Sequence, residues 1–459
     1  MNDSHLSLLK RSQQTSPSAH SWRRSDTLAV VILIAAALAT SLIGIVRAPQ
    51  FSPIDEMTHV DYTWRVMHGS FPHRGDNMTA WTLEEWTCHR QTNFPQLPAC
   101  GKHTAADFNR DIENSNAWQP PLYYIYDAAF TRAAMKVSDA DPVNIMRLGS
   151  GTLIGAGLAA TYALCRMWNI KRSVAFAVTI FLLCEPHIAT EAMTVTEDAA
   201  ALIISIGALW TLSLVLHNHP HAWVYAAMVA FVAAMSKTIL LSPVITMCAV
   251  LLFGLTRWTR NHDPRTMNAV RTMVAAAAAA AIPTLLWNHY TAAHTPAGWH
   301  STTLGINNRP LDGLPFNVWL PGILRGYGFN GGYWVEPKLT TYLGTGVFAL
   351  VAIVLTAAPW VGLACGTTKE RVVSAVSAIG PFIAIFLVQF DEWIRENVYF
   401  PLPSPRYAAS LIGATAIALA IALNRLPARW RWFAVAVCVV CVAASTLGLL
   451  GVTLMPSSS

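Results

Sequence analysis

The sequence predicts an all-α membrane protein with about eleven transmembrane helices. Three observations support this fold class. Hydrophobic residues make up 54% of the 459 residues and charged residues only 12%, far below the charged fraction of a typical soluble domain. Apolar runs long enough to cross a bilayer recur along nearly the whole chain. The connections between many of these runs are short and basic, as in the cytoplasmic loops of membrane proteins.

The chain begins with a polar, serine-rich segment, 1–26, that carries lysine and arginine. We expect it to be a cytoplasmic tail. Residues 27–46 are the first apolar run, and 46–49 make a poor cleavage site, so we predict a retained helix and not a signal peptide. Residues 27–459 then form a single polytopic membrane domain.

Ten further apolar runs complete the predicted set of spans. They are 145–167, 173–190, 196–217, 221–238, 240–257, 268–288, 341–364, 372–390, 406–424 and 432–453. With the N-terminus inside, this set places the basic connections near 166–172, 257–265 and 425–431 in the cytoplasm, as the positive-inside rule prefers. The C-terminus then lies outside the cell.

The segment 119–135 is a difficult case, because it is apolar but short and interrupted by Asp127 and Arg132. Counting it as a span would place the basic connections outside. We therefore predict an amphipathic helix on the outer surface, with prolines in its first turn. A tilted span remains the alternative.

Two long outer segments follow from this topology, 47–144 and 289–340. Most of the charges near the membrane edge fall on the same side, which predicts a polar cavity open to the exterior. The members used below are Asp55, Glu56, His59, Asp61, Glu197, Asp198, Lys237, Arg325 and Arg406. The net charge of +6 is small for this length and gives no support to nucleic-acid binding.

The chemistry is concentrated just after the first span, at Asp55, Glu56, His59 and Asp61. Carboxylates beside hydrocarbon are costly unless they are paired, bound to metal or in a wet cleft. Asp55 or Glu56 could act as a general base or bind a divalent cation, shared with Glu197 or Asp198. In the structural alternative, Asp55 and Glu56 cap the next helix.

Cys88 and Cys100 are the only two of the eight cysteines in an outer segment. Disulfides persist outside the cytoplasm, so we predict a disulfide between them. Metal binding by these cysteines with His89 and His103 is an alternative, although the spacing matches common zinc sites poorly. The other cysteines lie in or beside spans and are predicted to be packed thiols.

Several short motifs resemble landmarks of GT-C-fold membrane glycosyltransferases, especially the protein-mannosyltransferase and aminoarabinose-transferase group. The motifs are Asp55-Glu56 with His59 and Tyr62, Gly69-x-x-Pro72, the segment from Trp118 and Gln119 to Tyr123 and Tyr124, Arg147-Leu148, the segment 329–334, and Pro405-Arg406-Tyr407. In that group an Asp-Glu pair lies in the first outer loop, and an outer helix begins at a Pro-Pro-Leu segment. Ser404 and Pro405 stand near a position where relatives often have glycine, which leaves the role of Arg406 less defined.

The resemblance implies an enzyme that transfers a sugar from a polyprenyl-phosphate donor to a glycan or lipid acceptor of the cell envelope. Asp55, or else Glu56, would deprotonate the acceptor in an inverting displacement. Lys237, Arg406 and Arg325 would bind the donor phosphate, although Lys237 and Arg406 could instead snorkel to the interface. His59, Asp61, Glu197, Asp198, Gln119 and Tyr123 would support the site. The implied location is a bacterial plasma membrane. A transporter or lipid flippase, or a non-catalytic scaffold, would also place charges in a membrane.

Overall fold

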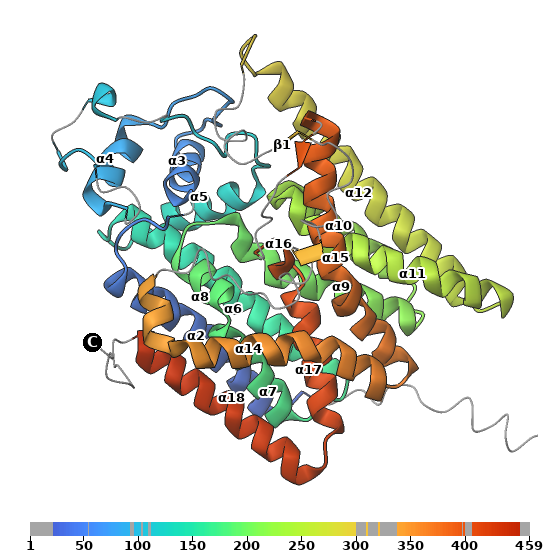
Figure 1. The fold of residues 1–459 in the computed structure, drawn as a ribbon. Coiled ribbons are helices and arrows are strands. Elements are labelled where there is room, and N and C mark those ends of the chain that lie inside the picture. The colour runs from blue at the N-terminus through green and yellow to red at the C-terminus, as the bar shows by residue number, and fades with distance from the viewer. Residues whose placement is uncertain are drawn as a thin grey trace, which may run out of the picture.

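The computed structural model describes residues 22–53, 55–91, 96–101, 104–108, 112–299, 309–310, 320–321, 337–396, 398–399 and 406–449. The described chain is almost entirely helical, as predicted (Figure 1). Its only named strands, β1 (Arg309–Pro310) and β2 (Val398–Tyr399), form one short antiparallel pair.

Seven described helices are long and apolar enough to cross a membrane. They comprise α2 (Arg24–Arg47), α6 (Pro142–Met167), η3 (Glu197–Ala200) with α9 (Ala201–Leu216), η4 (Thr238–Leu241) with α11 (Ser242–Arg260), α12 (Arg265–Ala293), the first part of α15 (Thr368–Glu396), and α18 (Ala428–Leu449). Shorter apolar helices lie in α10 (Ala222–Ser236), α14 (Pro337–Cys365) and α17 (Ile412–Arg425), which follows α16 (Arg406–Ala409). The protein is therefore an all-α membrane protein.

The predicted span 173–190 is broken in the structure. It consists of α7 (Arg172–Phe181), η2 (Leu182–Cys184) and α8 (Pro186–Met193), and the two parts are bent by 71°. The break occurs at Glu185, which has an extended backbone, because the residue before a proline avoids the helical region. The Glu185 side chain accepts a hydrogen bond from Ile188 N (3.0 Å) and so caps α8.

The first long outer segment folds into short helices that lie together at one corner of the molecule (upper left in Figure 1). They are α3 (Glu56–Met67), α4 (Ala80–His89), η1 (Ala105–Asp107) and α5 (Leu122–Ala134). Aromatic and aliphatic side chains, including Phe51, Tyr62 and Trp86, form a separate hydrophobic core beneath them. α5 covers the segment 119–135; it has 13 residues and is not among the candidate spans of the described chain.

Small residues allow α6 to pack closely against its neighbours. A Cβ atom at Gly151 would lie 2.0 Å from Ser41 Oγ of α2, and one at Gly157 would lie 2.8 Å from Leu202 of α9. Larger side chains at these two positions would separate the helices. α6 is therefore held at the centre of the bundle, where its first turn can support the outer corner.

A buried ion cluster ties α2, α6 and α7 together at the end away from that corner. Asp26 of α2 is fully buried. Its carboxylate accepts hydrogen bonds from Arg166 Nε (3.2 Å), from Arg172 Nε (3.0 Å) and from the Tyr162 hydroxyl (2.7 Å). Two arginines and a tyrosine thus compensate one buried charge.

Candidate active site

Asp55 stands at the start of α3 in an unusual backbone conformation. Its φ is 48° and its ψ is 12°, in the left-handed region, which few residues other than glycine adopt and in which aspartate is enriched. Its side chain is exposed and makes no cap hydrogen bond to α3. Such backbone strain is found more often at functional sites. The carboxylate of Asp55 is thus presented to solvent and does not serve as a helix cap.

Glu56 is placed very differently, although it is the next residue. It is fully buried. Arg147 donates to it from Nε to Oε1 (2.8 Å) and from Nη2 to Oε2 (3.1 Å). The backbone N–H groups of Ser52 (2.6 Å) and Val195 (3.0 Å) donate as well. Both carboxylate oxygens are therefore occupied, and Glu56 is an anchor between α3, α6 and the chain before η3.

Arg147 also binds the turn that leads into α3. Its guanidinium donates to the backbone carbonyls of Ala48 (3.3 Å), Pro49 (3.4 Å) and Gln50 (2.8 Å). One arginine thus holds the end of α2, the turn and Glu56 in a single arrangement. This network fixes the position of the adjacent Asp55.

A second cluster of charges lies one turn further along α3. His59 Nδ1 is 2.9 Å from Glu197 Oε2. Lys237 Nζ lies 2.8 Å from Glu197 Oε1 and 2.8 Å from Asp198 Oδ1. Glu197 and Asp198 begin η3, and Lys237 lies in the break between α10 and η4. Since a carboxylate can only accept, the short contact with Glu197 places the proton of His59 on Nδ1.

Aromatic and amide side chains surround this cluster. The Tyr124 hydroxyl donates to Glu197 Oε2 (3.3 Å) and lies 2.9 Å from His59 Nδ1. Tyr62 stacks on Tyr124 with ring centroids 3.7 Å apart. Burial and the negative charge of Glu197 raise the pKa of Tyr124 well above its usual value, so its hydroxyl stays protonated and remains a donor. Asn116 Nδ2 lies 3.3 Å from His59 Nε2.

The remaining predicted supporting residues hold the outer corner together. Asp61 is fully buried and accepts from Arg65 Nε (2.9 Å), Thr79 N (2.7 Å) and Asn114 Nδ2 (2.8 Å). Gln119 accepts a hydrogen bond from the Tyr62 hydroxyl through its backbone carbonyl (3.0 Å).

Tyr123 lies at the contact between α5, α6 and η3. Its hydroxyl is 2.8 Å from Ser150 Oγ and accepts from Thr196 N (3.1 Å). It therefore positions the residue before Glu197, and its contacts are those of a support for the site.

The structure brings together His59, Glu197, Asp198 and Lys237. Asp55 is the N-cap residue of α3, the helix that carries His59. Glu56 points instead to Arg147. Arg325 and the side chain of Arg406, which begins α16, lie outside the described residues.

No protein-family profile matches this chain, and no curated protein matches it. Solved structures do match it, and two of them are ArnT structures. ArnT from Cupriavidus metallidurans bound to undecaprenyl phosphate matches with a TM-score of 0.51 and 15% sequence identity over 94% of this chain. ArnT from the same organism in the apo state matches with a TM-score of 0.51 and 16% identity, also over 94% of this chain.

This chain has the GT-C fold of ArnT. The matched region covers 66% of the ArnT chain, so this chain spans slightly less than two thirds of that length. The predicted fold class is thereby confirmed.

The contacts of Glu56 leave no room for the divalent cation that the sequence analysis considered at this residue. Among the described residues, both oxygens of Glu56 and both oxygens of Glu197 already lie against protein donors. A metal would have to displace Arg147 or Lys237 from a buried carboxylate, which would leave a charge uncompensated. Glu56 and Glu197 therefore do not fit a metal ion. Cation binding by Asp55 or Asp198 stays a prediction, and no step is assigned to a metal.

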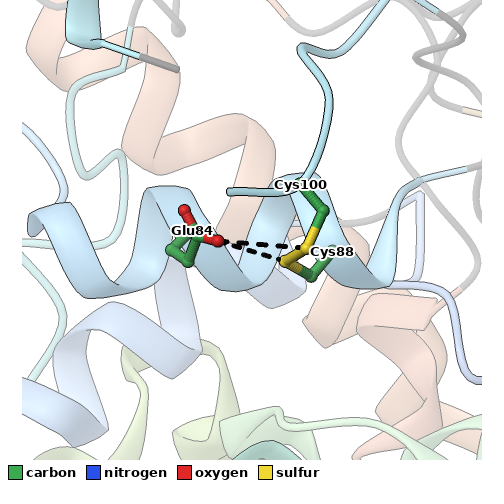
Figure 2. Close-up of side chains that lie close together, drawn as sticks. All are labelled: Glu84, Cys88 and Cys100. Atoms are coloured by element: carbon green, nitrogen blue, oxygen red, sulfur yellow. Dashed lines mark hydrogen bonds between the residues drawn. A yellow bond between two sulfur atoms is a disulfide. The ribbon is translucent and has the colours of Figure 1, made fainter. Parts of the chain in front are cut away.

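Cys88 and Cys100 form a disulfide in the outer corner, with Cα atoms 4.6 Å apart. Figure 2 shows the Glu84 carboxylate beside both sulfur atoms, at 3.4 Å from Cys88 Sγ and 3.9 Å from Cys100 Sγ. His103, the fourth residue of the alternative metal set, lies outside the described residues.

Three residues of the site were given no chemical role in the sequence analysis, although Arg147 and Tyr124 belong to the motifs of the resemblance. Arg147, Tyr124 and Asn116 hold Glu56, Glu197 and His59, respectively. An arginine in the first turn of an apolar helix requires a partner, so Arg147 could have been paired with one of the outer acids. Nothing in the sequence selects which acid.

Proposed function

We propose that the protein is a membrane glycosyltransferase that transfers a sugar from a polyprenyl-phosphate donor to a glycan or lipid acceptor of the cell envelope, with inversion. The observation that carries the proposal is an exposed, strained Asp55 at the start of α3, whose His59 belongs to a buried ion cluster, in an ArnT-like fold. One of the two matching ArnT structures holds undecaprenyl phosphate, the chemical class of lipid proposed here as the donor carrier.

In the proposed reaction, Asp55 acts as the general base. Its carboxylate takes the proton from an acceptor hydroxyl while the hydroxyl oxygen attacks the anomeric carbon of the donor. The bond between that carbon and the phosphate oxygen breaks, and polyprenyl phosphate leaves with the electron pair. A single displacement of this kind inverts the anomeric centre. Glu56 is the weaker candidate, because both of its oxygens accept hydrogen bonds in a buried ion pair.

The leaving phosphate requires positive charge. Arg325 and Arg406 are proposed to provide most of it, since arginine binds phosphate oxygens in a bidentate manner. Lys237 is bound to Glu197 and Asp198, so a phosphate would have to share its ammonium group with two carboxylates. We therefore assign Lys237 mainly to positioning, and His59 and Glu197 to holding α3 against η3.

The proposed site faces the extracytoplasmic side of a bacterial plasma membrane, with the N-terminus inside and the C-terminus outside. Basic residues support this orientation. Arg166 and Arg172 gather around Asp26 at the end of the bundle away from Asp55, where positive charge is expected on the cytoplasmic side.

The test is sugar transfer by the purified full chain, with a polyprenyl-phosphate sugar as the donor. Asp55→Asn keeps a residue that tolerates the left-handed backbone, and removing a general base is expected to lower turnover about 100-fold to 10,000-fold. Asp139→Asn, an exposed acid of the same outer segment, is the matched control and should transfer at the wild-type rate. Undiminished turnover in Asp55→Asn would end the base assignment. Movement of lipid across liposomes without any transfer would favour a flippase.

A further inference from the structure

Outside the proposed site, three potential metal ligands meet at the outer corner. Glu85 and His89 lie four residues apart on α4, and Asp141 stands just before α6. His89 Nε2 is 2.9 Å from Asp141 Oδ2 and 3.5 Å from Glu85 Oε2. The three ligand atoms all lie within 4.8 Å of one another, and all three residues are partly buried.

The other ring nitrogen of His89 is held from behind. Nδ1 lies 2.9 Å from the carbonyl oxygen of Pro49, which can only accept, so Nδ1 carries a proton. Metal-binding histidines in proteins usually donate this second N–H to a carbonyl or carboxylate, which fixes the tautomer and aims the free nitrogen at the metal. The Pro49 carbonyl therefore directs Nε2 toward the two carboxylates.

The carboxylate of Asp141 is oriented in a similar way. Its Oδ1 accepts from Val143 N (2.8 Å) and caps α6. Oδ2 faces His89 and also accepts from Asn144 Nδ2 (3.3 Å). Glu85 approaches from the same side as His89, because residues four apart share one face of a helix.

We propose that Glu85, His89 and Asp141 bind one divalent transition-metal ion, such as zinc. Imidazole and carboxylate are ligands that zinc accepts, at about 2.0–2.2 Å each, and a tetrahedral site of that size separates its ligands by about 3.4 Å. The 3.5 Å from Nε2 to Glu85 matches this spacing, and the 2.9 Å to Asp141 would lengthen by about 0.5 Å around an ion. With three protein ligands, a fourth position is left for water.

A second group of donors, Glu84, Cys88 and Cys100, does not compete for this role. Its two sulfur atoms are joined in the disulfide (Figure 2), and metal binding requires thiolate. The group at His89 consists only of nitrogen and oxygen ligands, so it is compatible with an oxidising compartment.

The metal would act as a structural clasp. It would join α4 to the beginning of α6 and, through Nδ1 of His89, to the Pro49 carbonyl, which also accepts from Arg147 (3.4 Å). Arg147 in turn binds Glu56. The clasp is thus connected to the turn before Asp55 but contains none of the residues assigned to sugar transfer.

The competing arrangement is a salt bridge without metal. Burial favours a neutral imidazole, but hydrogen bonds to Asp141 and Glu85 outweigh it and raise the pKa of His89 to about 10 in the absence of an ion. In the salt bridge, Nε2 of His89 carries a proton at the position that the metal ion would occupy. The salt bridge binds no zinc ion and the metal site binds one, so zinc stoichiometry distinguishes them.

The experiment measures zinc in the purified full chain after treatment with a chelator and titration with zinc chloride. Wild type should bind one more zinc ion per chain than His89→Gln and should gain thermal stability on titration, because an ion that binds only the folded state stabilises it. Glu85→Gln should weaken binding at least 10-fold. Glu84→Gln, the neighbouring acid on α4, is the matched control and should bind like wild type.

The proposal is overturned if wild type and Glu85→Gln bind zinc with equal stoichiometry and affinity, or if Glu84→Gln loses as much binding as Glu85→Gln. Glu85→Gln replaces only one carboxylate oxygen, so we expect it to fold. It therefore tests the zinc site even if His89→Gln does not fold. Binding is measured without any sugar donor, so the result does not depend on the proposed transferase activity.

Discussion

The ion pair between Glu56 and Arg147 distinguishes a structural carboxylate from the carboxylate of Asp55, which is proposed to act as the general base. Each side chain of the pair is 1% exposed. Glu56→Gln would leave the Arg147 charge with only the carbonyls of the preceding turn, and Arg147→Met would leave the Glu56 charge with two backbone N–H groups. Removing one partner of a buried pair costs about 3–5 kcal/mol. We expect each single variant to lose that much free energy of unfolding.

The double variant Glu56→Gln/Arg147→Met removes both charges. It should therefore be destabilised by less than the sum of the single variants, with a coupling energy of about 2 kcal/mol or more between these directly contacting residues. The assay is unfolding in mixed detergent micelles, followed for the wild type, the two single variants and the double variant.

Turnover completes the comparison. Per folded molecule, Glu56→Gln should lose less transfer activity than Asp55→Asn, because it loosens the turn that positions Asp55 but keeps the Asp55 carboxylate. Asp55→Asn should lose activity at wild-type stability. The reasoning is refuted if Glu56→Gln unfolds like wild type and yet transfers no sugar, since Glu56 would then take part in the reaction and not in the framework.

Three further predictions concern buried or cross-linked groups. Burial raises the pKa of Asp127 well above its usual value. The protonated carboxyl therefore stabilises the fold fully below about pH 4, and this stabilisation is lost as pH rises through the folded-state pKa. Asp127→Asn should match wild type near pH 4 and should unfold at a higher temperature than wild type at pH 8. Lys237→Met leaves the buried Glu197 carboxylate without its ammonium partner and should lower the free energy of unfolding by about 3–5 kcal/mol, measured by denaturant titration. Reducing the disulfide between Cys88 and Cys100, which are 12 residues apart, should cost about 2–4 kcal/mol, seen as a lower thermal midpoint with reductant that a Cys88→Ser/Cys100→Ser variant does not show.

Much of the fold was predictable because it depends on local composition. Each of the eleven predicted apolar runs corresponds to a helix or a pair of helices. The break at Glu185 was missed, although Pro186 marks it, because the surrounding residues are apolar enough to give a continuous run. Hydropathy gives the length of an apolar segment but not the direction in which its helices run.

The candidate site was predictable by residue type but not by pairing. The sequence places Asp55 and Glu56 side by side, yet one is exposed and the other is buried against Arg147, 91 residues away. Lys237 was predicted to bind phosphate because it is a cation near the membrane edge, and it contacts Asp198, 39 residues earlier. Which charge meets which depends on how helices pack, and that packing is set by small residues and side-chain shape along whole helices.

The two polar attachments of α2 have a consequence for the route of a lipid-linked substrate. At the N-terminal end of α2, Asp26 binds two arginines. After its C-terminal end, Arg147 binds backbone carbonyls of the turn. Because α2 is held at both ends, it cannot move away from the bundle without breaking a buried ion pair. We therefore expect the long prenyl chain of the proposed donor to enter on another side of the helix bundle. That side is beside α12, where Leu285 and Leu286 are 67% and 66% exposed.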